Sequence, residues 1–402
     1  MKAFKSEIQA KKILVIFVMT TLFFIAGTAA QYKKSAYSTN NDFWVYYKTS
    51  ERISTSNWQD IYTRKDGPFP YRYIPYSLMA ISWIDHFPEI EARKIWVVIQ
   101  ATAFAAGFYY LYLSLVFMGS EWPLLAVCLS ILLSFRHYID SLYSGQVAGI
   151  VFLSFTMGLN FFLKKRMILD GAVNSVAASL KIFPGILIIH GFIKTPGISK
   201  KLRFLFLGIL LFIAFNILFM LWIKLFHQDA SIGELWRNWI EICRADSEYF
   251  DGSTPKSQSL RSFMLRVFGK TAEVEMLWKI LTLVGIAALI VYWCRKSAET
   301  IYEEGFGYCL GIMAFIFLMP ESLPYQVMNV AIPLGVLISH PKMKTNLSYK
   351  LMLGCFAIFM SFASTDFIGR WPSDRVQALS LPFFVMCFLT CLLFNKDHVV
   401  KT

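Results

Sequence analysis

The sequence predicts an all-α, polytopic integral membrane protein, and three observations support this class. The 402 residues are 56% hydrophobic and only 16% charged, whereas charged residues make up about a quarter of a typical soluble domain. Apolar runs of about 15–25 residues recur along the chain between short charged islands. Lys and Arg gather at the ends of these runs, as they do where positive charge sets membrane orientation. We expect one membrane-embedded domain, residues 1–402.

The net charge of +13 does not by itself indicate a nucleic-acid partner. The basic residues stand in pairs and triplets beside apolar runs and form no basic domain, so membrane orientation accounts for them and no nucleic acid is expected. Of the seven Cys, six lie within apolar runs and Cys243 stands alone. This pattern predicts neither a disulfide framework nor a Cys-x-x-Cys metal site. We therefore expect no metal and no cofactor.

The first apolar segment, residues 13–30, follows a basic flank and ends in small residues, so it fits both a cleaved signal peptide and a retained first helix. We expect retention, with the N-terminus in the cytoplasm and residues 31–94 outside. Charge bias then predicts nine further spans: 95–118, 122–137, 146–163, 201–226, 277–294, 305–319, 324–339, 349–366 and 376–394. Residues 71–84, interrupted by Pro75, are expected to lie along the outer surface. This topology places both termini in the cytoplasm of a plasma (inner) membrane protein.

Residues 170–194 do not fit this alternation. They lie between two basic clusters that both belong inside, and they carry Lys181 and Pro184 near the centre. A buried Lys is costly in hydrocarbon and Pro removes a helix hydrogen bond, so the pattern predicts two half-helices that form a hairpin facing a polar cavity. One irregular span with a snorkelling Lys remains the alternative.

Polar segments converge on the predicted outer face, including the long loop 227–276, and loops of this length usually have a function. Asp42 is the leading candidate there, because it stands beside Phe43, Tyr46 and Tyr47 just after the first span. A carboxylate at the membrane surface can act as a general base toward a hydroxyl. The alternative is a structural role, since "NND" before "FWVYYKTSERI" is also a helix start signal.

Four cationic side chains could neutralise a phosphate without a metal: Lys181, Arg72, Arg261 and Arg266. The alternatives are solvation on an exposed helical face for Arg261 and Arg266, and contact with lipid headgroups for Arg72. Gln146, at the start of a predicted inward helix, could reach a ligand or a helix end. Glu321, between two spans, could be a second acid or a turn residue.

Taken together, these features resemble the type C glycosyltransferases, and within them glycosyltransferase family 87. The resemblance rests on segments in family order: Asp42-Phe43 with Tyr46-Tyr47, "FPYRYIP" (69–75), "GQV" (145–147), "SLKIFP" (179–184), "QSL" (258–260) with Arg266, and "PES" (320–322). The chain departs from the family pattern at Ala148 and Ser257, where the family usually has Asn, and at Leu323 and Tyr325, which stand in place of Trp and His.

The resemblance implies a type C glycosyltransferase-like bundle with about ten full spans, a broken-helix hairpin and outer-surface helices. It implies an inverting, metal-independent transfer of a hexose such as mannose from a polyprenyl-phosphate donor to a lipid or glycan acceptor on the outer face. Asp42 would be the general base, and the four cations would bind the donor phosphate. The residues expected to bind substrate are Tyr46, Tyr47, Tyr73, Gln146, Gln258, Glu321, Ser322 and Tyr325.

Other function classes stay open on the sequence alone. A secondary transporter would place its coupling acids on broken helices near the bilayer midplane, and only Lys181 fits that pattern. A polymerase or ligase of surface polysaccharide would account for a large late outer loop with Arg residues, but not for Asp42 after the first span. A non-catalytic membrane scaffold is the third alternative, which an activity assay separates from the others.

Overall fold

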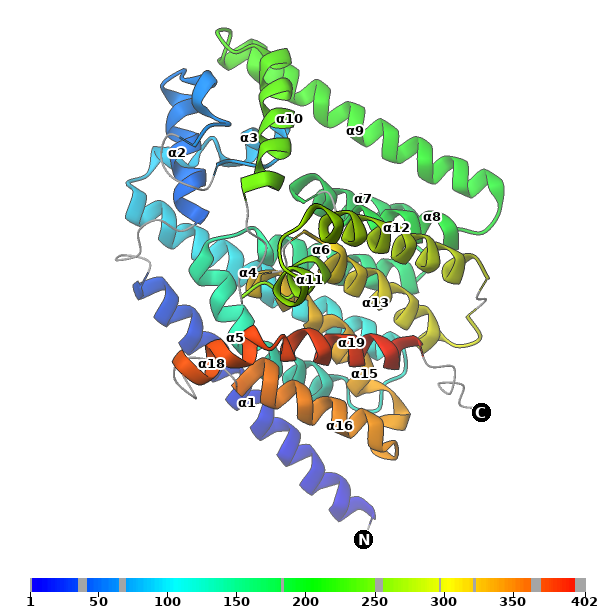
Figure 1. The fold of residues 1–402 in the computed structure, drawn as a ribbon. Helices are drawn as coiled ribbons and strands as arrows, with labels where there is room; N and C mark the ends of the chain where they lie inside the picture. The colour runs from blue at the N-terminus through cyan, green and yellow to red at the C-terminus, as the bar shows by residue number, and fades with distance from the viewer. Residues whose placement is uncertain are drawn as a thin grey trace.

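The computed structural model is a bundle of helices (Figure 1), and it describes residues 2–34, 42–64, 70–181, 184–249, 256–295, 298–320, 323–362 and 370–394. Over these ranges the chain forms helices and no strands, which confirms the all-α prediction. A helix satisfies its backbone hydrogen bonds within one segment, as the hydrocarbon of a membrane requires.

Six helices in the described part of the chain are long and apolar enough to cross a membrane. They are α1 (Lys2–Lys34, apolar over Lys11–Lys34), α4 (Glu89–Phe117), α5 (Pro123–Ser144), α9 (Ile198–Phe226), α12 (Ala272–Arg295) and α13 (Ile301–Leu318). A seventh is present if α18 (Arg370–Ala378) and α19 (Leu381–Phe394), which meet at 50°, form one bent span. The protein thus has the helices of a membrane protein.

The expected count of ten full spans is not confirmed, because four of those segments correspond to shorter or bent helices. Residues 146–163 form α6 (Ala148–Leu163), and its 16 residues measure about 24 Å, less than the ~30 Å hydrocarbon core. Residues 324–339 form α14 (Pro324–Val327), a 3-10 turn (Met328–Val330) and α15 (Ala331–Ser339). Residues 349–366 begin within α16 (Leu347–Phe356), which continues into a π-helix (Ala357–Phe362). Residues 376–394 contain the bend before α19.

Helix α13 lies at the centre of the bundle. In its most apolar stretch 72% of the residues are buried, compared with 11% in α1, 12% in α9 and 11% in α12. Helix α6 packs against α13 and closely against α4, and the Gly149 N–H at the start of α6 donates to Oε1 of Gln100 on α4 at 2.8 Å. The low burial of α1, α9 and α12 means that these outer helices expose apolar side chains, as helices that face lipid do.

The predicted break within residues 170–194 is confirmed. Helix α7 (Met167–Leu180) ends just before Lys181, and α8 (Gly185–Lys194) begins just after Pro184, while residues 182–183 lie outside the described ranges. The two helices run antiparallel, because Gly185 faces Ala178 and Gly191 faces Asp170. Pro184 has no N–H to continue the helix and stands where the second helix starts, a position that tolerates proline.

Short elements gather at one end of the bundle. They are α2 (Asp42–Ser54), 3-10 turns at Trp58–Asp60, Pro75–Ser77 and Ile84–His86, α3 (Leu78–Ile81) and the amphipathic α10 (Ile232–Tyr249). Figure 1 shows α2, α3 and α10 at the upper left, while the start of α1 and the end of α19 lie toward the lower right. Residues 71–84 form no long helix: they contain the 3-10 turn at Pro75–Ser77 and the four-residue helix α3.

Two further elements complete the described chain: α11 (Leu260–Phe268) and a 3-10 turn at Pro341–Lys344. Ser259 caps α11, because its Oγ accepts the N–H of Ser262 at 3.2 Å. Helix α11 packs against α12 and α13. Helix α11 is therefore part of the helical bundle. In the sequence it lies far from the short elements around α2.

Candidate functional site

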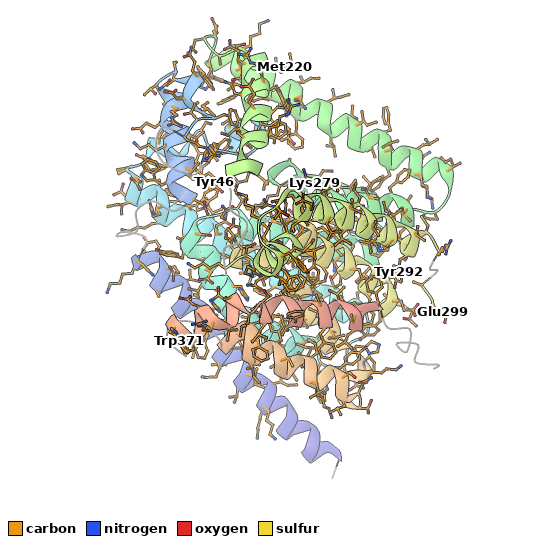
Figure 2. All side chains as sticks on the ribbon, in the orientation of Figure 1. Tyr46, Met220, Lys279, Tyr292, Glu299 and Trp371 are labelled. Carbon is orange, nitrogen blue, oxygen red and sulfur yellow. The ribbon has the colours of Figure 1, made fainter. Side chains whose placement is uncertain are left out.

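Helix α2 places Asp42 at its first residue, where the sequence predicts a helix start. One face of the helix is buried through Phe43, Tyr46, Ser50 and Ile53, a spacing of three to four residues that fits one side of a helix. Figure 2 shows Tyr46 on this helix, at the end of the molecule opposite Tyr292 and Glu299. Burial of this face fixes the helix, and the partial positive charge at its N-terminus favours an ionised Asp42.

The turn between α5 and α6 brings Gln146 to Asp42. Helix α5 ends at Gly145, whose φ of 72° is accessible to glycine at little cost. The indole N–H of Trp96 donates to the Gly145 carbonyl at 2.7 Å, and the Trp96 ring packs on Phe43 with ring centroids 6.2 Å apart. The side chain of the next residue, Gln146, hydrogen-bonds the Asp42 carboxylate.

Opposing effects act on the carboxylate of Asp42. Burial raises its pKa, because desolvation disfavours the charged form. The hydrogen bond from Gln146 and the positive charges of Lys181 and Arg72 lower the pKa and partly offset burial. The structure thus brings together an acid, an amide and two cations that the sequence analysis selected independently.

Two predicted substrate residues join this group through hydrogen bonds. The Tyr73 hydroxyl donates to Oε1 of Gln146 at 2.8 Å, and the Tyr46 and Tyr73 hydroxyls hydrogen-bond each other. Burial raises the pKa of both phenols, so both stay protonated. We call Tyr46, Tyr73, Gln146 and Asp42 the hydrogen-bond chain.

The two cations reach this region from different segments. Lys181 follows the last residue of α7, and its Nζ lies 4.7 Å from the ring centroid of Tyr325, within range of a cation–π interaction. The Arg72 backbone is held by α10, because the indole N–H of Trp239 donates to the Arg72 carbonyl at 3.0 Å, while the Arg72 side chain is exposed. Both residues carry positive charge close enough to Asp42 to affect its pKa.

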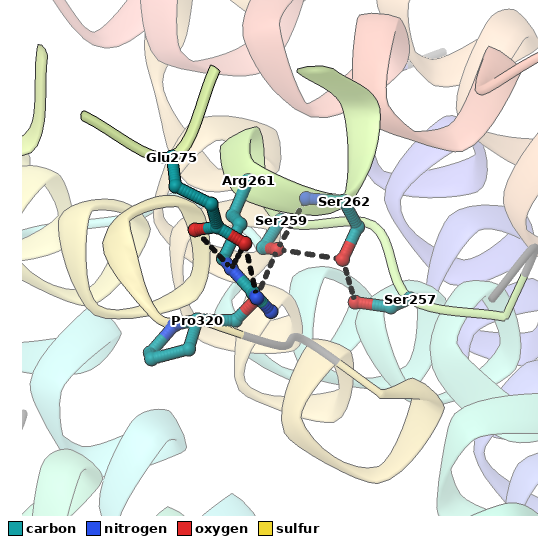
Figure 3. Close-up of polar contacts among 6 residues, drawn as sticks. All are labelled: Ser257, Ser259, Arg261, Ser262, Glu275 and Pro320. Carbon is teal, nitrogen blue, oxygen red and sulfur yellow. Dashed lines mark hydrogen bonds and ion pairs between the residues drawn. The ribbon is translucent and has the colours of Figure 1, made fainter. Parts of the chain in front are cut away.

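Arg261 lies in different surroundings, on α11 (Figure 3). Its Nε lies 2.9 Å and its Nη2 2.5 Å from carboxylate oxygens of Glu275 on α12, and only 5% of the Arg261 side chain is exposed. Beside it Ser262 hydrogen-bonds both Ser257 and Ser259, and Ser259 Oγ donates to the Pro320 carbonyl at 3.1 Å. These contacts give Arg261 a role in holding α11 to α12.

Three more of the predicted residues, Arg266, Gln258 and Tyr47, have hydrogen-bond partners outside the hydrogen-bond chain. Arg266 donates to the Ser257 carbonyl at 2.7 Å and to Ser380 Oγ at 2.9 Å. Gln258 is buried, and its amide lies 3.4 Å from the Gln377 carbonyl. The Tyr47 hydroxyl lies 3.4 Å from the Phe87 carbonyl. Glu321 and Ser322 lie outside the described residues.

Sequence reasoning missed Gly145 and Trp96 as residues that shape the site. A signal for Gly145 is present, because glycine after the last residue of a helix is a common terminator. Nothing in the sequence links Trp96 to the "SGQ" turn, since the contact crosses between helices. Among the described residues, no group of three or more His, Cys, Asp or Glu side chains is arranged to hold a metal ion.

The comparisons with known proteins identify the class of this chain. It belongs to glycosyltransferase family 87, whose family model matches residues 71–320, more than half of the 402 residues. The protein is therefore a glycosyltransferase, and the resemblance inferred from the sequence is confirmed. A search of curated proteins found no match. The matched region contains Arg72, Tyr73, Gln146 and Lys181 and begins after Asp42.

Proposed function

We propose that the protein is an inverting, metal-independent transferase that moves a hexose such as mannose from a polyprenyl phosphate to a hydroxyl of a lipid or glycan acceptor on the outer face of the membrane. The observation that carries this proposal is the position of Asp42, which shares its surroundings with Lys181 and Arg72 and hydrogen-bonds Gln146. One acid beside two cations supplies the charges that such a transfer needs.

The reaction is a single displacement at the anomeric carbon. The acceptor oxygen forms a bond to that carbon while the bond from the carbon to the phosphate oxygen breaks. The polyprenyl phosphate leaves with the electron pair, and Asp42 takes the proton of the acceptor hydroxyl. Attack opposite the leaving group inverts the configuration, because no covalent sugar–enzyme intermediate forms.

Lys181 and Arg72 would bind the donor phosphate and stabilise the negative charge that grows on it as the bond breaks. Lys181 is well placed for this role, because it stands at the break between α7 and α8, where its ammonium lies over the Tyr325 ring. The exposed Arg72 side chain, on a backbone fixed by Trp239, can approach the same phosphate from the outer end. Arg261 and Arg266 would not bind the phosphate, because Glu275 and Ser380 engage their guanidinium groups.

The experiment that tests the proposal is a donor panel. Purified protein in lipid nanodiscs is incubated with polyprenyl phosphates that carry different hexoses and with an extract of membrane lipids and glycans as acceptor. Release of polyprenyl phosphate that requires the acceptor is the expected result, and the anomeric configuration of the product reports inversion. Transfer from nucleotide sugars with no use of any polyprenyl-phosphate sugar would overturn the donor class, and a product of retained configuration would overturn the single displacement.

A further inference from the structure

The hydrogen bonds that link Tyr46 and Tyr73 to Asp42 through Gln146 all run in the same direction from donor to acceptor. Gln146 has one acceptor oxygen and one donor nitrogen in its side-chain amide. Because Oε1 accepts the Tyr73 hydroxyl at 2.8 Å, the NH₂ group is left for Asp42, whose carboxylate can only accept. Tyr73 has then donated its proton, so Tyr46 must donate to the Tyr73 oxygen. Every proton in the hydrogen-bond chain points toward Asp42.

From this geometry we propose that Tyr73 is a positioning residue for the transfer reaction: it locks the Gln146 amide so that its NH₂ group always faces Asp42, which keeps the carboxylate ionised and aimed at the acceptor. This inference rests on the proposed function of Asp42 as the base. It assigns Tyr73 and Gln146 a role different from the substrate binding that the resemblance implies. Tyr46 supports the same orientation one step further away.

The packing around the chain supports a fixed role. Tyr46 and Tyr71 are each only 2% exposed, and the Tyr46 ring packs edge-on against both Tyr73 and Trp96, with centroids 5.5 Å apart in each pair. The Tyr62 hydroxyl donates to the Tyr73 carbonyl at 3.1 Å, which fixes its backbone. A phenol held on its ring and on its backbone can orient an amide for little further loss of entropy.

The charged and titratable groups near Asp42 include two cations and two phenols. Lys181 and Arg72 act directly on its pKa, and the phenols of Tyr46 and Tyr73 stay protonated. Arg93 on α4 lies over the Phe43 ring at 5.3 Å, but it is paired with Glu89 at 2.5 Å. Of these groups, Tyr73 is the one whose removal frees Gln146 to rotate without changing a charge.

The consequence of freeing Gln146 has a definite sign. A rotated amide would present Oε1 to Asp42, an arrangement that binds the protonated carboxyl and disfavours the carboxylate. Tyr73→Phe should therefore raise the pKa of Asp42. Because the transfer requires the carboxylate, the acid limb of the pH–rate profile should move to higher pH, by about one unit for one charge-assisted hydrogen bond.

Three Tyr→Phe variants form a graded test in nanodiscs. Tyr73→Phe should give the largest shift, and Tyr46→Phe a smaller shift in the same direction. Tyr71→Phe is the matched control, because the Tyr71 ring packs 5.3 Å from the Tyr73 ring, while its hydroxyl pairs with Ser77 outside the chain. It should leave the acid limb in place. A raised KM with an unshifted acid limb in Tyr73→Phe would overturn the proposal and return Tyr73 to substrate binding.

A second readout does not depend on turnover. The carboxyl band of Asp42 can be titrated by infrared difference spectroscopy, with Asp42→Asn to assign the band. The proposal expects the titration midpoint to rise in Tyr73→Phe, and an unchanged midpoint overturns it. Should Tyr73→Phe fail to fold, the midpoint of Tyr46→Phe decides in the same way. Normal turnover by Asp42→Asn would remove the proposed base, whereas the infrared midpoints would still judge the orientation of Gln146, so the two failures are distinguishable.

Discussion

Gly145 and Phe43 lie so close that a Cβ on Gly145 would stand 2.6 Å from the Cβ of Phe43. This contact joins the turn before Gln146 to the start of the helix that carries Asp42, so a bare backbone at residue 145 is what lets the two side chains meet. The φ of 72° at Gly145 adds a second requirement for glycine.

The first prediction follows from this contact. Gly145→Ala should lower the melting temperature and reduce transfer strongly, because the new methyl must push Phe43, and with it Asp42, away from Gln146. Gly119→Ala is the matched control, since Gly119 has a φ of 76° and open space around its Cβ position. Both variants lose about 1–2 kcal/mol to backbone strain, so thermal melting and turnover of the pair isolate the steric part. Equal effects on turnover would show that the contact with Phe43 does not position the site.

The second prediction concerns Asp42 itself. Asp42→Asn keeps the size of the side chain and can still accept a hydrogen bond from Gln146, but it cannot take a proton from the acceptor. Turnover should fall by about 10²–10⁴-fold while the fold and donor affinity persist. Rates with purified protein and a donor-binding assay provide the check. A variant that works at nearly the normal rate would mean that Asp42 only starts its helix, because Asn serves that purpose equally well.

The third prediction separates a phosphate ligand from a snorkelling lysine at residue 181. Lys181→Met should insert normally and bind the polyprenyl-phosphate donor about ten- to a hundredfold more weakly, the loss expected for one charge-assisted contact. Lys279→Met, at an exposed position on α12, is the control and should bind the donor normally. Equal donor affinities of the two variants, measured by calorimetry in detergent, would favour snorkelling.

The fourth prediction distinguishes the cations of α11 from those beside Asp42. Arg261→Gln should destabilise the protein by about 1–3 kcal/mol, because it leaves the Glu275 carboxylate without its charged partner, yet donor affinity should stay the same in the folded fraction. Arg72→Gln should show the opposite pattern, with normal thermal stability and weaker donor binding. Weakened donor binding in folded Arg261→Gln would restore that residue to the phosphate site.

The fifth prediction tests the orientation in the membrane, which rests on the basic clusters. In a background without cysteine, Thr55→Cys should react with an impermeant thiol reagent in intact cells, whereas Lys165→Cys should react only after the membrane is opened. Thr55 follows α2 and is exposed, as is Lys165 between α6 and α7. Labelling of Cys at position 165 from outside would reverse the predicted threading.

The sequence by itself determined the features that depend on neighbouring residues. Composition and the spacing of basic clusters established an all-α membrane protein, and the start of α2 at Asp42 and the break after Lys181 followed from local start signals and from Pro184. These features are local because helix termini and interruptions are decided by hydrogen bonds within a few residues. The segments around Tyr73 and Gln146 also sufficed to indicate the family.

Only the tertiary structure decided which candidates meet. The sequence could not distinguish Arg72 from Arg261, yet Arg72 lies near Asp42 while Glu275 pairs with Arg261. The sequence also did not show which predicted spans are short or bent helices. Hydropathy records how apolar a run is, and it does not record whether the helix stays straight. Asp42 and Gln146 are separated by α4 and α5, so their hydrogen bond depends on how those helices pack, and packing between distant segments is a property of the whole fold.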